Sequence, residues 1–255
     1  MALNHAAILA RTIIGIIGNV ISFALFLSPV PTFVKVIKWR STREFSGVPY
    51  VVMLLNSTLW VFYGIPAAVS NNILVSTTNG IGTVLEIVYI IIFLIFSDYR
   101  ERRKIVLLLS AVPIIFTAVV LCNMLFVDTL PRRAEIVGSL CIVAGIGMYA
   151  APLTIMGKVI RAKSVKYMPF ALSFTYFING LFWSTYACMG IDIFLLIANG
   201  AGALLGACQL VLYATYYHGV HPEDQEKTRQ DGHELEKVTT VTEANQEIHI
   251  SKTTK

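Results

Sequence analysis

The sequence is poor in charge. Only 14% of its 255 residues are charged, whereas 56% are hydrophobic, and the mean hydropathy is +0.69. A soluble domain usually carries about 25% charged residues. Because one soluble core of this size cannot hide so much apolar surface, the composition favours a membrane protein.

Other missing features exclude several classes of function. Only four cysteines are present, all in apolar runs without CxxC or His-rich spacing: Cys122, Cys141, Cys188 and Cys208. This pattern argues against a disulfide framework and against a zinc site, so no metal site is expected. No basic stripe interleaved with aromatic residues exists, so nucleic acid is not an expected partner. The apolar runs hold no nucleophile–base pair and no phosphate-binding loop, so we expect neither an enzyme nor a cofactor.

What the sequence does contain is a series of apolar runs. Seven runs have roughly the length of a membrane span: 7–33, 47–69, 73–97, 105–127, 135–157, 170–190 and 193–217. The N-terminus lacks a signal-peptide pattern, so the first run is expected to be a retained span. Since a backbone in lipid must satisfy its own hydrogen bonds, and since strand-like alternation is absent, these runs predict helices in a multi-pass integral membrane protein surrounded by lipid.

The connectors between the runs alternate in charge. The first, third and fifth connectors together hold twelve Lys and Arg residues, the fourth holds two, the second holds none, and the sixth holds only Asp192. The positive-inside rule then predicts an N-terminus outside and a C-terminus in the cytosol. The final segment, 218–255, has eight acidic and five basic residues and is expected to be a disordered cytosolic tail.

A repeat divides the chain. KVIKWRS begins at Lys35 and KVIRAKS begins at Lys158, an offset of 158 − 35 = 123 positions. The same offset aligns Pro29 with Pro152, Asn56 with Asn179, Trp60 with Trp183 and Tyr63 with Tyr186, and Asn79-Gly80 matches Asn199-Gly200 after a three-residue gap. Each repeat, 7–97 and 135–217, covers three spans, and the span 105–127 between them restores the orientation of the second. The sequence thus predicts an all-α membrane protein with two parallel three-helix bundles joined by one linker helix, and the two-fold arrangement indicates a translocation path.

At this point the chain resembles the SWEET family of bidirectional sugar transporters. The resemblance rests on FLSPVPTF from Phe26, FSGVPYVV from Phe45, MYAAPLTIM from Met148, KSVKYMPF from Lys163 and the paired Asn-Gly motifs. It implies the same arrangement of three, one and three helices. It also implies facilitative sugar transport and a homo-oligomer, either a dimer or a trimer.

The resemblance also implies roles for particular residues. A proline tetrad would act as a hinge and cytosolic gate, although single prolines at helix starts are common: Pro29, Pro49, Pro152 and Pro169. Sugar-binding side chains would line a central cavity: Asn79, Asn199, Trp60, Trp183, Asn56, Asn179, Leu25 and Met148. Amides can bond sugar hydroxyls and indole faces can cover a sugar ring, but helix–helix hydrogen bonds and interfacial tryptophans are the alternatives. Tyr63 and Asp192 would close an extracellular gate, the alternative being solvation at the interface.

Glu86 and Asn71 also bear on the function. Glu86 is the one clear carboxylate deep in a span, and we expect a structural hydrogen bond there, because no relay of acids or histidines accompanies it. Its isolation favours facilitated diffusion over proton coupling. Relatives often have a Lys in the loop after Tyr63 where this chain has Asn71, so a salt-bridge version of the outer gate is not expected.

The resulting expectation is a hexose uniporter that works by alternating access. The implied cavity residues are larger than the Val and Ser of sucrose-preferring relatives, which favours glucose-like monosaccharides. The plasma membrane is the expected location, with the vacuole or another endomembrane as the alternative. Two rival functions remain: a proton-coupled PQ-loop carrier of another small solute, whose Pro-Gln signature is missing, and a seven-helix receptor, which predicts no repeat.

Overall fold

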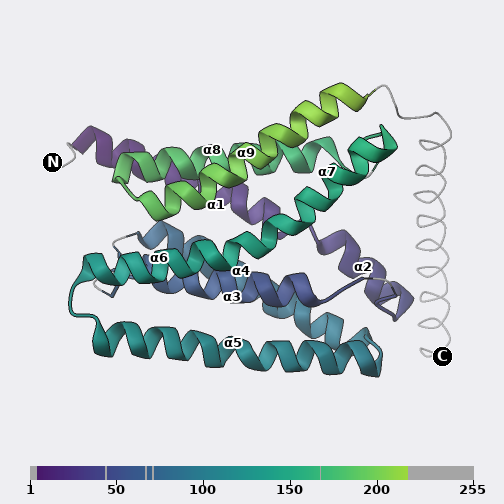
Figure 1. Cartoon of the computed structure of the whole chain (residues 1–255), viewed down its shortest axis with the longest axis horizontal. Coiled ribbons are helices and arrows are strands. Elements are labelled where there is room, and N and C mark those ends of the chain that lie inside the picture. Colours follow the sequence, from purple (N-terminus) through teal and green to yellow (C-terminus); the bar gives the residue numbers. More distant parts are fainter. Residues whose placement is uncertain (1–4, 44, 67, 71, 167, 218–255) are drawn as a thin grey trace, which may run out of the picture.

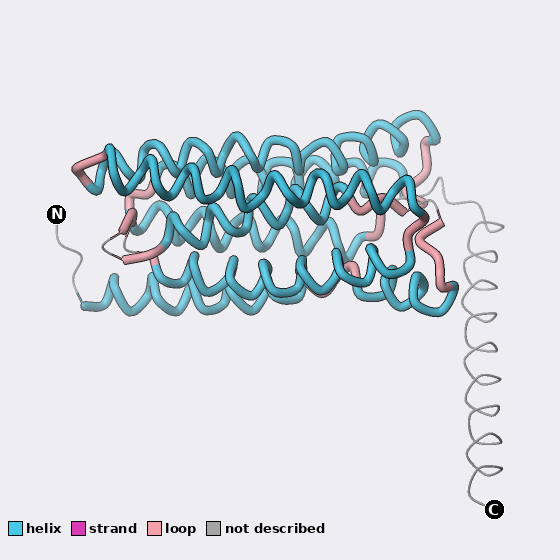
Figure 2. Tube along the Cα trace, turned by 90° about the horizontal axis from the view of Figure 1, so that it is seen from below, coloured by secondary structure: helices cyan, strands magenta, loops and turns pink. Residues whose placement is uncertain are grey.

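The computed structural model describes residues 5–43, 45–66, 68–70, 72–166 and 168–217. The expected disordered tail, 218–255, and Asn71 lie outside these residues. The described part contains helices and no strand (Figures 1 and 2). The helices are α1 (His5–Phe26), α2 (Val30–Trp39), α3 (Val48–Gly64), α4 (Ile73–Phe96), α5 (Tyr99–Phe126), α6 (Leu130–Ile146), the short η1 (Gly147–Tyr149), α7 (Ala150–Ala162), α8 (Phe170–Gly190) and α9 (Ile193–Tyr216).

These elements form seven rod-like segments, because two segments are broken in the middle. α2 continues α1 after a turn at residues 27–29, and Pro29 is the N-cap of α2. α7 continues α6 after the single 3-10 turn η1, just before Pro152. A proline lacks the N–H that a continuous helix needs, which explains why both breaks lie beside prolines 123 positions apart.

The lengths of some segments differ from the predicted spans. Five segments of the described chain are long and apolar enough to cross a membrane, namely 5–39, 73–96, 99–126, 130–162 and 193–216. α3 is apolar but has only 17 residues, because it ends at Gly64 instead of residue 69. After Gly64 the chain folds back, and the Ser70 N–H donates to the Tyr63 carbonyl at 3.1 Å. Val69 is buried in this loop (2% exposed), so burial under neighbouring helices, not lipid, accounts for the apolar sequence there.

The first helix of each repeat packs on both repeats. α1 contacts α4 of its own repeat and α8 of the other, and α6 likewise contacts α9 of its own repeat and α3 of the other. Glycines permit these close approaches. A Cβ on Gly15 of α1 would lie 2.6 Å from the Leu74 side chain, and one on Gly138 of α6, 123 positions later, would lie 2.5 Å from Phe194. The two repeats are therefore interlocked in the same way, while α5 packs beside α3 on one flank (Figure 1).

The bundle has two chemically different ends. We call the end where α1 begins the N-terminal end; the described residues between α3 and α4 and the loops 127–129 and 191–192 also lie there (Figure 1). The other end receives the twelve Lys and Arg residues of the odd connectors, and we call it the basic end. Helix caps at the basic end repeat too, because Arg40 and Lys163 both adopt the left-handed conformation, with φ of 50° and 48°.

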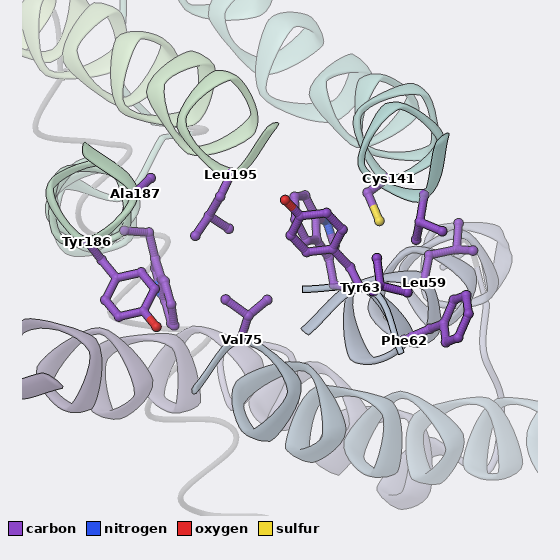
Figure 3. Packing of buried hydrophobic residues seen from close by; sticks show 12 residues of the cluster. Leu59, Phe62, Tyr63, Val75, Cys141, Tyr186, Ala187 and Leu195 are labelled. Carbon is purple, nitrogen blue, oxygen red and sulfur yellow. The ribbon is translucent and has the colours of Figure 1, made fainter. Parts of the chain in front are cut away.

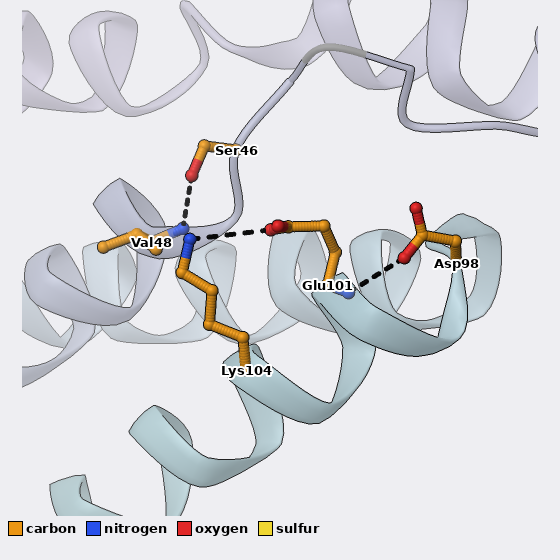
Figure 4. A network of polar contacts seen from close by, with 5 residues as sticks. All are labelled: Ser46, Val48, Asp98, Glu101 and Lys104. Atoms are coloured by element: carbon orange, nitrogen blue, oxygen red, sulfur yellow. Dashed lines mark hydrogen bonds and ion pairs between the residues drawn. The ribbon is translucent and has the colours of Figure 1, made fainter.

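Local polar contacts fix the start of α5 at the basic end (Figure 4). Asp98 caps the helix by accepting a hydrogen bond from the Glu101 N–H at 2.9 Å, and Lys104 lies 3.8 Å from the Glu101 carboxylate. The nearby Val48 N–H, at the start of α3, bonds Ser46 Oγ at 3.3 Å. A side-chain cap of this kind stabilises the first turn of a helix.

Candidate functional site

The two repeats meet in a shared aromatic core near the N-terminal end. Trp60 packs edge-on to Tyr63 with ring centres 5.2 Å apart, and Trp183 packs the same way on Tyr186 at 5.4 Å. The indole side chains are only 6% and 4% exposed. In this conformation both rings therefore belong to the core between the repeats.

A second pair lies at the centre of that core. Val75 on α4 and Leu195 on α9 point toward each other from opposite repeats (Figure 3). One helical turn further along each helix come Asn79 and Asn199 on the same faces. Each amide donates from Nδ2 to the carbonyl four residues earlier, at 2.9 Å in both cases. Neither Oδ1 accepts a hydrogen bond from another described residue, so both amides have spare bonding capacity.

The pair formed by Asn56 and Asn179 is not symmetric. Asn179 Oδ1 accepts a hydrogen bond from Ser22 Oγ at 2.7 Å, and the Trp183 indole N–H donates to the same hydroxyl at 2.9 Å. Asn56 Oδ1 is buried and, within the described chain, has no partner. It faces Gly145, whose added Cβ would lie 3.7 Å away.

Gly145 is the repeat equivalent of Ser22, since 145 − 22 = 123. The hydroxyl that satisfies Asn179 is thus missing beside Asn56. An unpaired buried acceptor normally costs about 1–3 kcal/mol, so this position calls for a donor from elsewhere.

The remaining predicted residues flank the breaks and the helix starts. Leu25 and Met148, again 123 positions apart, lie half-buried beside the breaks in the first and fifth segments. Pro49 is the second residue of α3, and Pro169 is the N-cap of α8. A proline is well tolerated at a helix start, so the positions of these last two are equally compatible with an ordinary structural role.

The N-terminal end is closed by polar side chains from both repeats. Tyr63 Oη donates to Asp192 Oδ1 at 2.8 Å, and Asn72 Nδ2 donates to Asp192 Oδ2 at 2.7 Å. Arg11 donates to Asn72 Oδ1 at 2.6 Å, and Tyr186 Oη donates to the same oxygen at 3.3 Å. We call these five residues the Asn72–Asp192 network. It joins α1, α3, the loop before α4, α8 and the start of α9.

Arg11 and Asn72 were not predicted from the sequence, and Tyr186 was identified only as the repeat equivalent of Tyr63. The available signal was a lone cation in the otherwise apolar first run, but its partners come from loops and helices far away in the chain. A pocket of about 400 Å³ opens beside the network, and its lining includes Arg11, Asn72, Gly190 and Asp192.

Within the described part of the chain, Glu86 does not make the structural hydrogen bond that the sequence predicted. Its side chain is 0% exposed, and neither carboxylate oxygen has a partner among the described residues. Tyr89, one turn away, uses its hydroxyl to donate to the Phe26 carbonyl at 2.7 Å, where α1 ends. The Tyr89 hydroxyl therefore bonds the backbone at the helix break and not the carboxylate.

The geometry contains no cluster suited to a metal. Within the ranges that the structure describes, no group of three or more His, Cys, Asp or Glu residues is placed to hold an ion. The side chains of Asn56, Asn79 and Asn199 are neutral amides, which can donate hydrogen bonds to a neutral polar ligand and accept them from it.

Comparisons with known proteins agree with this architecture. Residues 12–101 and 135–220 match the family described as "Sugar efflux transporter for intercellular exchange", which leaves all of α5 beyond its first three residues outside both matched stretches. Bidirectional sugar transporter SWEET7b of Oryza sativa subsp. japonica is 49% identical over 219 residues, covering 86% of this chain and 82% of the relative. Bidirectional sugar transporter SWEET5 of Arabidopsis thaliana is 48% identical, covering 87% of this chain and 92% of that protein. A solved structure of a eukaryotic SWEET transporter is similar, with a TM-score of 0.80 and 39% identity over 84% of this chain and 99% of the other.

Proposed function

The chain belongs to the SWEET family of sugar transporters, and from this premise we propose that it is a bidirectional uniporter that moves hexoses across a membrane by alternating access. It is not an enzyme, since its relatives are transporters. We propose that residues 7–97 and 135–217 are the two moving units and that the helix at 105–127 links them. The sugar then binds between the units, near the middle of the bundle.

The observation that carries this proposal is the set of unsatisfied amides between the repeats. Among the residues that the structure describes, no donor bonds the Oδ1 of Asn79 or Asn199 or the buried Oδ1 of Asn56. A neutral sugar carries many hydroxyl donors and no charge, which matches amide acceptors without an accompanying cation or metal. We assign these three residues to direct hydrogen bonds with the sugar.

The aromatic and apolar residues would act beside these amides. Trp60 and Trp183 lie between the amides and the N-terminal end, where movement of the units would bring an indole face against the sugar ring. Asn179, Leu25 and Met148 would narrow the cavity. Their volume supports a monosaccharide in preference to a disaccharide.

The gates follow from the differences between the two ends. The Asn72–Asp192 network ties the units together at the N-terminal end, so we propose that Tyr63 and Asp192 form the extracellular gate and that it is closed in this conformation. At the basic end α2 packs on α4 and α7 packs on α9, each within its own unit. The prolines Pro29, Pro49, Pro152 and Pro169 would let these arms move separately and act as the cytosolic hinge.

The proposal includes an orientation and an assembly. The twelve cationic residues support a cytosolic basic end, so the N-terminal end would face outward, most naturally at the plasma membrane. Exposed apolar side chains cover much of the bundle surface, including Leu107 at 72% and Ile114 at 68% on α5, which supports lipid contact and a homo-oligomer.

Uptake and efflux in cells that lack sugar carriers test this function. Radiolabelled glucose, fructose and sucrose are measured separately, with and without a protonophore. We expect hexose flux in both directions, little sucrose flux and no effect of the protonophore. Loss of uptake with the proton gradient would instead support a proton-coupled carrier, and equal sucrose flux would contradict the hexose assignment.

A further inference from the structure

We infer that Arg11 is a positioning residue of the outer gate and that it acts through the Asn72 amide on the Asp192 carboxylate. This inference rests on the gate proposed above and extends it to a cation on a different helix.

Two-fold symmetry explains why Asn72 occupies this position. Asn79 and Asn199 are 120 positions apart, and the same offset relates Asn72 to Asp192. The bond from Tyr63 to Asp192 and the bond from Tyr186 to Asn72 are therefore mates in the two repeats. A third hydrogen bond, from Asn72 to Asp192, links these two equivalent tyrosine bonds to each other.

Of the two equivalent residues, Asp192 carries a charge and Asn72 does not, and this difference fixes the orientation of the Asn72 amide. Asp192 is acceptor-only when ionised, so Asn72 must present Nδ2 to it. The opposite atom, Oδ1, then needs donors of its own, and Arg11 supplies the shortest of these bonds, at 2.6 Å. If the amide turned over, Oδ1 would face the carboxylate and Nδ2 would face the guanidinium, so that like partial charges would meet at both ends. Arg11 thus fixes the orientation in which the amide links a cation to an anion.

Arg11 is itself held in place by the second repeat. Its Nε donates to the Tyr186 carbonyl at 3.3 Å, and its guanidinium lies 4.1 Å from the centre of the Tyr186 ring. A Cβ on Gly190 would overlap the guanidinium, so this glycine leaves room for it. The equivalent of Arg11 on α6 is Ala134, which lines the same pocket, so the first repeat alone provides the cation.

A cysteine introduced in the core beside the gate can be used to measure how often the gate opens. Val75 is 1% exposed and lies in the core between Tyr63 and Tyr186, about one helical turn after Asn72 (Figure 3). In a chain with Val75→Cys, and with the four native cysteines Cys122, Cys141, Cys188 and Cys208 replaced by alanine, a membrane-impermeant thiol reagent on the outer face labels position 75 only when the gate is open. The labelling rate therefore measures the open fraction without any transported sugar.

Removing the cation should open the gate. We expect Arg11→Ala and the bulkier Arg11→Gln to raise the labelling rate about tenfold, because each removes a charge-assisted hydrogen bond. Arg132→Ala is the matched control, since it removes an exposed cation from the same end of the bundle, and it should label at the parent rate. Adding Asn72→Lys to Arg11→Gln should restore slow labelling, because a lysine ammonium can pair with Asp192 directly.

The rescue separates positioning from packing. If Arg11 served only to pack α1 on α8, a lysine at position 72 would not compensate for its loss. Parent-like labelling in Arg11→Gln, or failure of the lysine to rescue it while thermal stability in detergent stays at the parent value, would overturn the inference. Failure of sugar uptake in every variant, the parent included, would overturn the proposed function and leave the labelling comparison intact.

Discussion

The first helices of the two repeats occupy equivalent places, yet α1 presents Arg11 and Ser22 where α6 presents Ala134 and Gly145. Arg11 bonds the Asn72 amide, and Ser22 bonds Asn179. On the α6 side the corresponding partners are missing, and Asn56 remains unpaired. The repeat thus supplies the architecture of two matching units, whereas the departures from it decide where charge is held and where a ligand can bind.

The largest effect is expected from removing the amide pair that both repeats share. Asn79→Ala combined with Asn199→Ala should lower hexose uptake about 100-fold, since two hydrogen bonds to the sugar are lost at about 1.4 kcal/mol each. Initial rates at equal surface expression measure this. Asn123→Ala on the linker α5 is the control, and its uptake should stay close to that of the parent. Unchanged uptake in the double variant would remove these residues from the site.

A smaller effect is expected from making the Asn56 side resemble the Asn179 side. Gly145→Ser places a hydroxyl within reach of Asn56 Oδ1, because the Cβ would lie 3.7 Å from it. The oxygen would then be satisfied internally, so the KM for hexose should rise about tenfold without loss of thermal stability.

The mirror variant, Ser22→Gly, should behave differently. It removes two internal hydrogen bonds, so it should lower the free energy of unfolding by about 2 kcal/mol and reduce the melting temperature in detergent. If Gly145→Ser left the KM unchanged, Asn56 would not be a sugar ligand.

Removing the hydroxyl of either gate tyrosine is expected to have an effect of intermediate size on the opening of the gate. Tyr63 donates to a carboxylate at 2.8 Å, whereas Tyr186 donates at 3.3 Å to an amide oxygen that it shares with Arg11. Tyr63→Phe should therefore raise the labelling rate of the position-75 cysteine about tenfold, and Tyr186→Phe only about twofold, because hydrogen bonds to charged groups are stronger. Equal rates in the two variants would mean that the charge on Asp192 does not strengthen the gate.

The smallest effect is expected at Glu86. The equivalent position in the second repeat is Gly206, where a Cβ would lie 2.8 Å from the Phe177 backbone, so the two repeats have different packing there. Because the Glu86 carboxylate bonds none of the described residues, Glu86→Gln should leave the rate of hexose uptake within about twofold of the parent. Uptake in the presence and absence of a protonophore checks this, and a new or lost protonophore effect would assign the carboxylate a part in coupling.

Much of the fold could be predicted from the sequence because the same hydropathy and proline patterns occur in both repeats. Hydropathy located the segments, and two of the four prolines predicted to form the hinge, Pro29 and Pro152, lie at the two breaks, whereas Pro49 and Pro169 lie at helix starts. The end of α3 was predicted wrongly because Val69 is apolar for a reason that hydropathy cannot distinguish from lipid contact, namely burial in a folded loop.

The hydrogen bonds between side chains were harder to predict from the sequence. Spacing alone brought Asn79 and Asn199 to corresponding faces, but it could not predict that Ser22 satisfies Asn179 while Asn56 stays unpaired. That outcome depends on α1 packing against α8 and α6 packing against α3, which are contacts between repeats. The same packing brings Arg11 to Asn72. The sequence shows only a single Arg in an apolar run, which does not indicate which residue it bonds.

The most direct test of the uniporter uses purified protein in liposomes. Labelled glucose uptake is followed to its plateau with equal pH on both sides and again with an imposed pH gradient, and liposomes with the Asn79→Ala, Asn199→Ala variant give the background. A passive two-fold sugar site predicts the same plateau in both conditions, at equal glucose concentration inside and outside. Accumulation above that level under the pH gradient would contradict it, as would uptake no faster than in the variant.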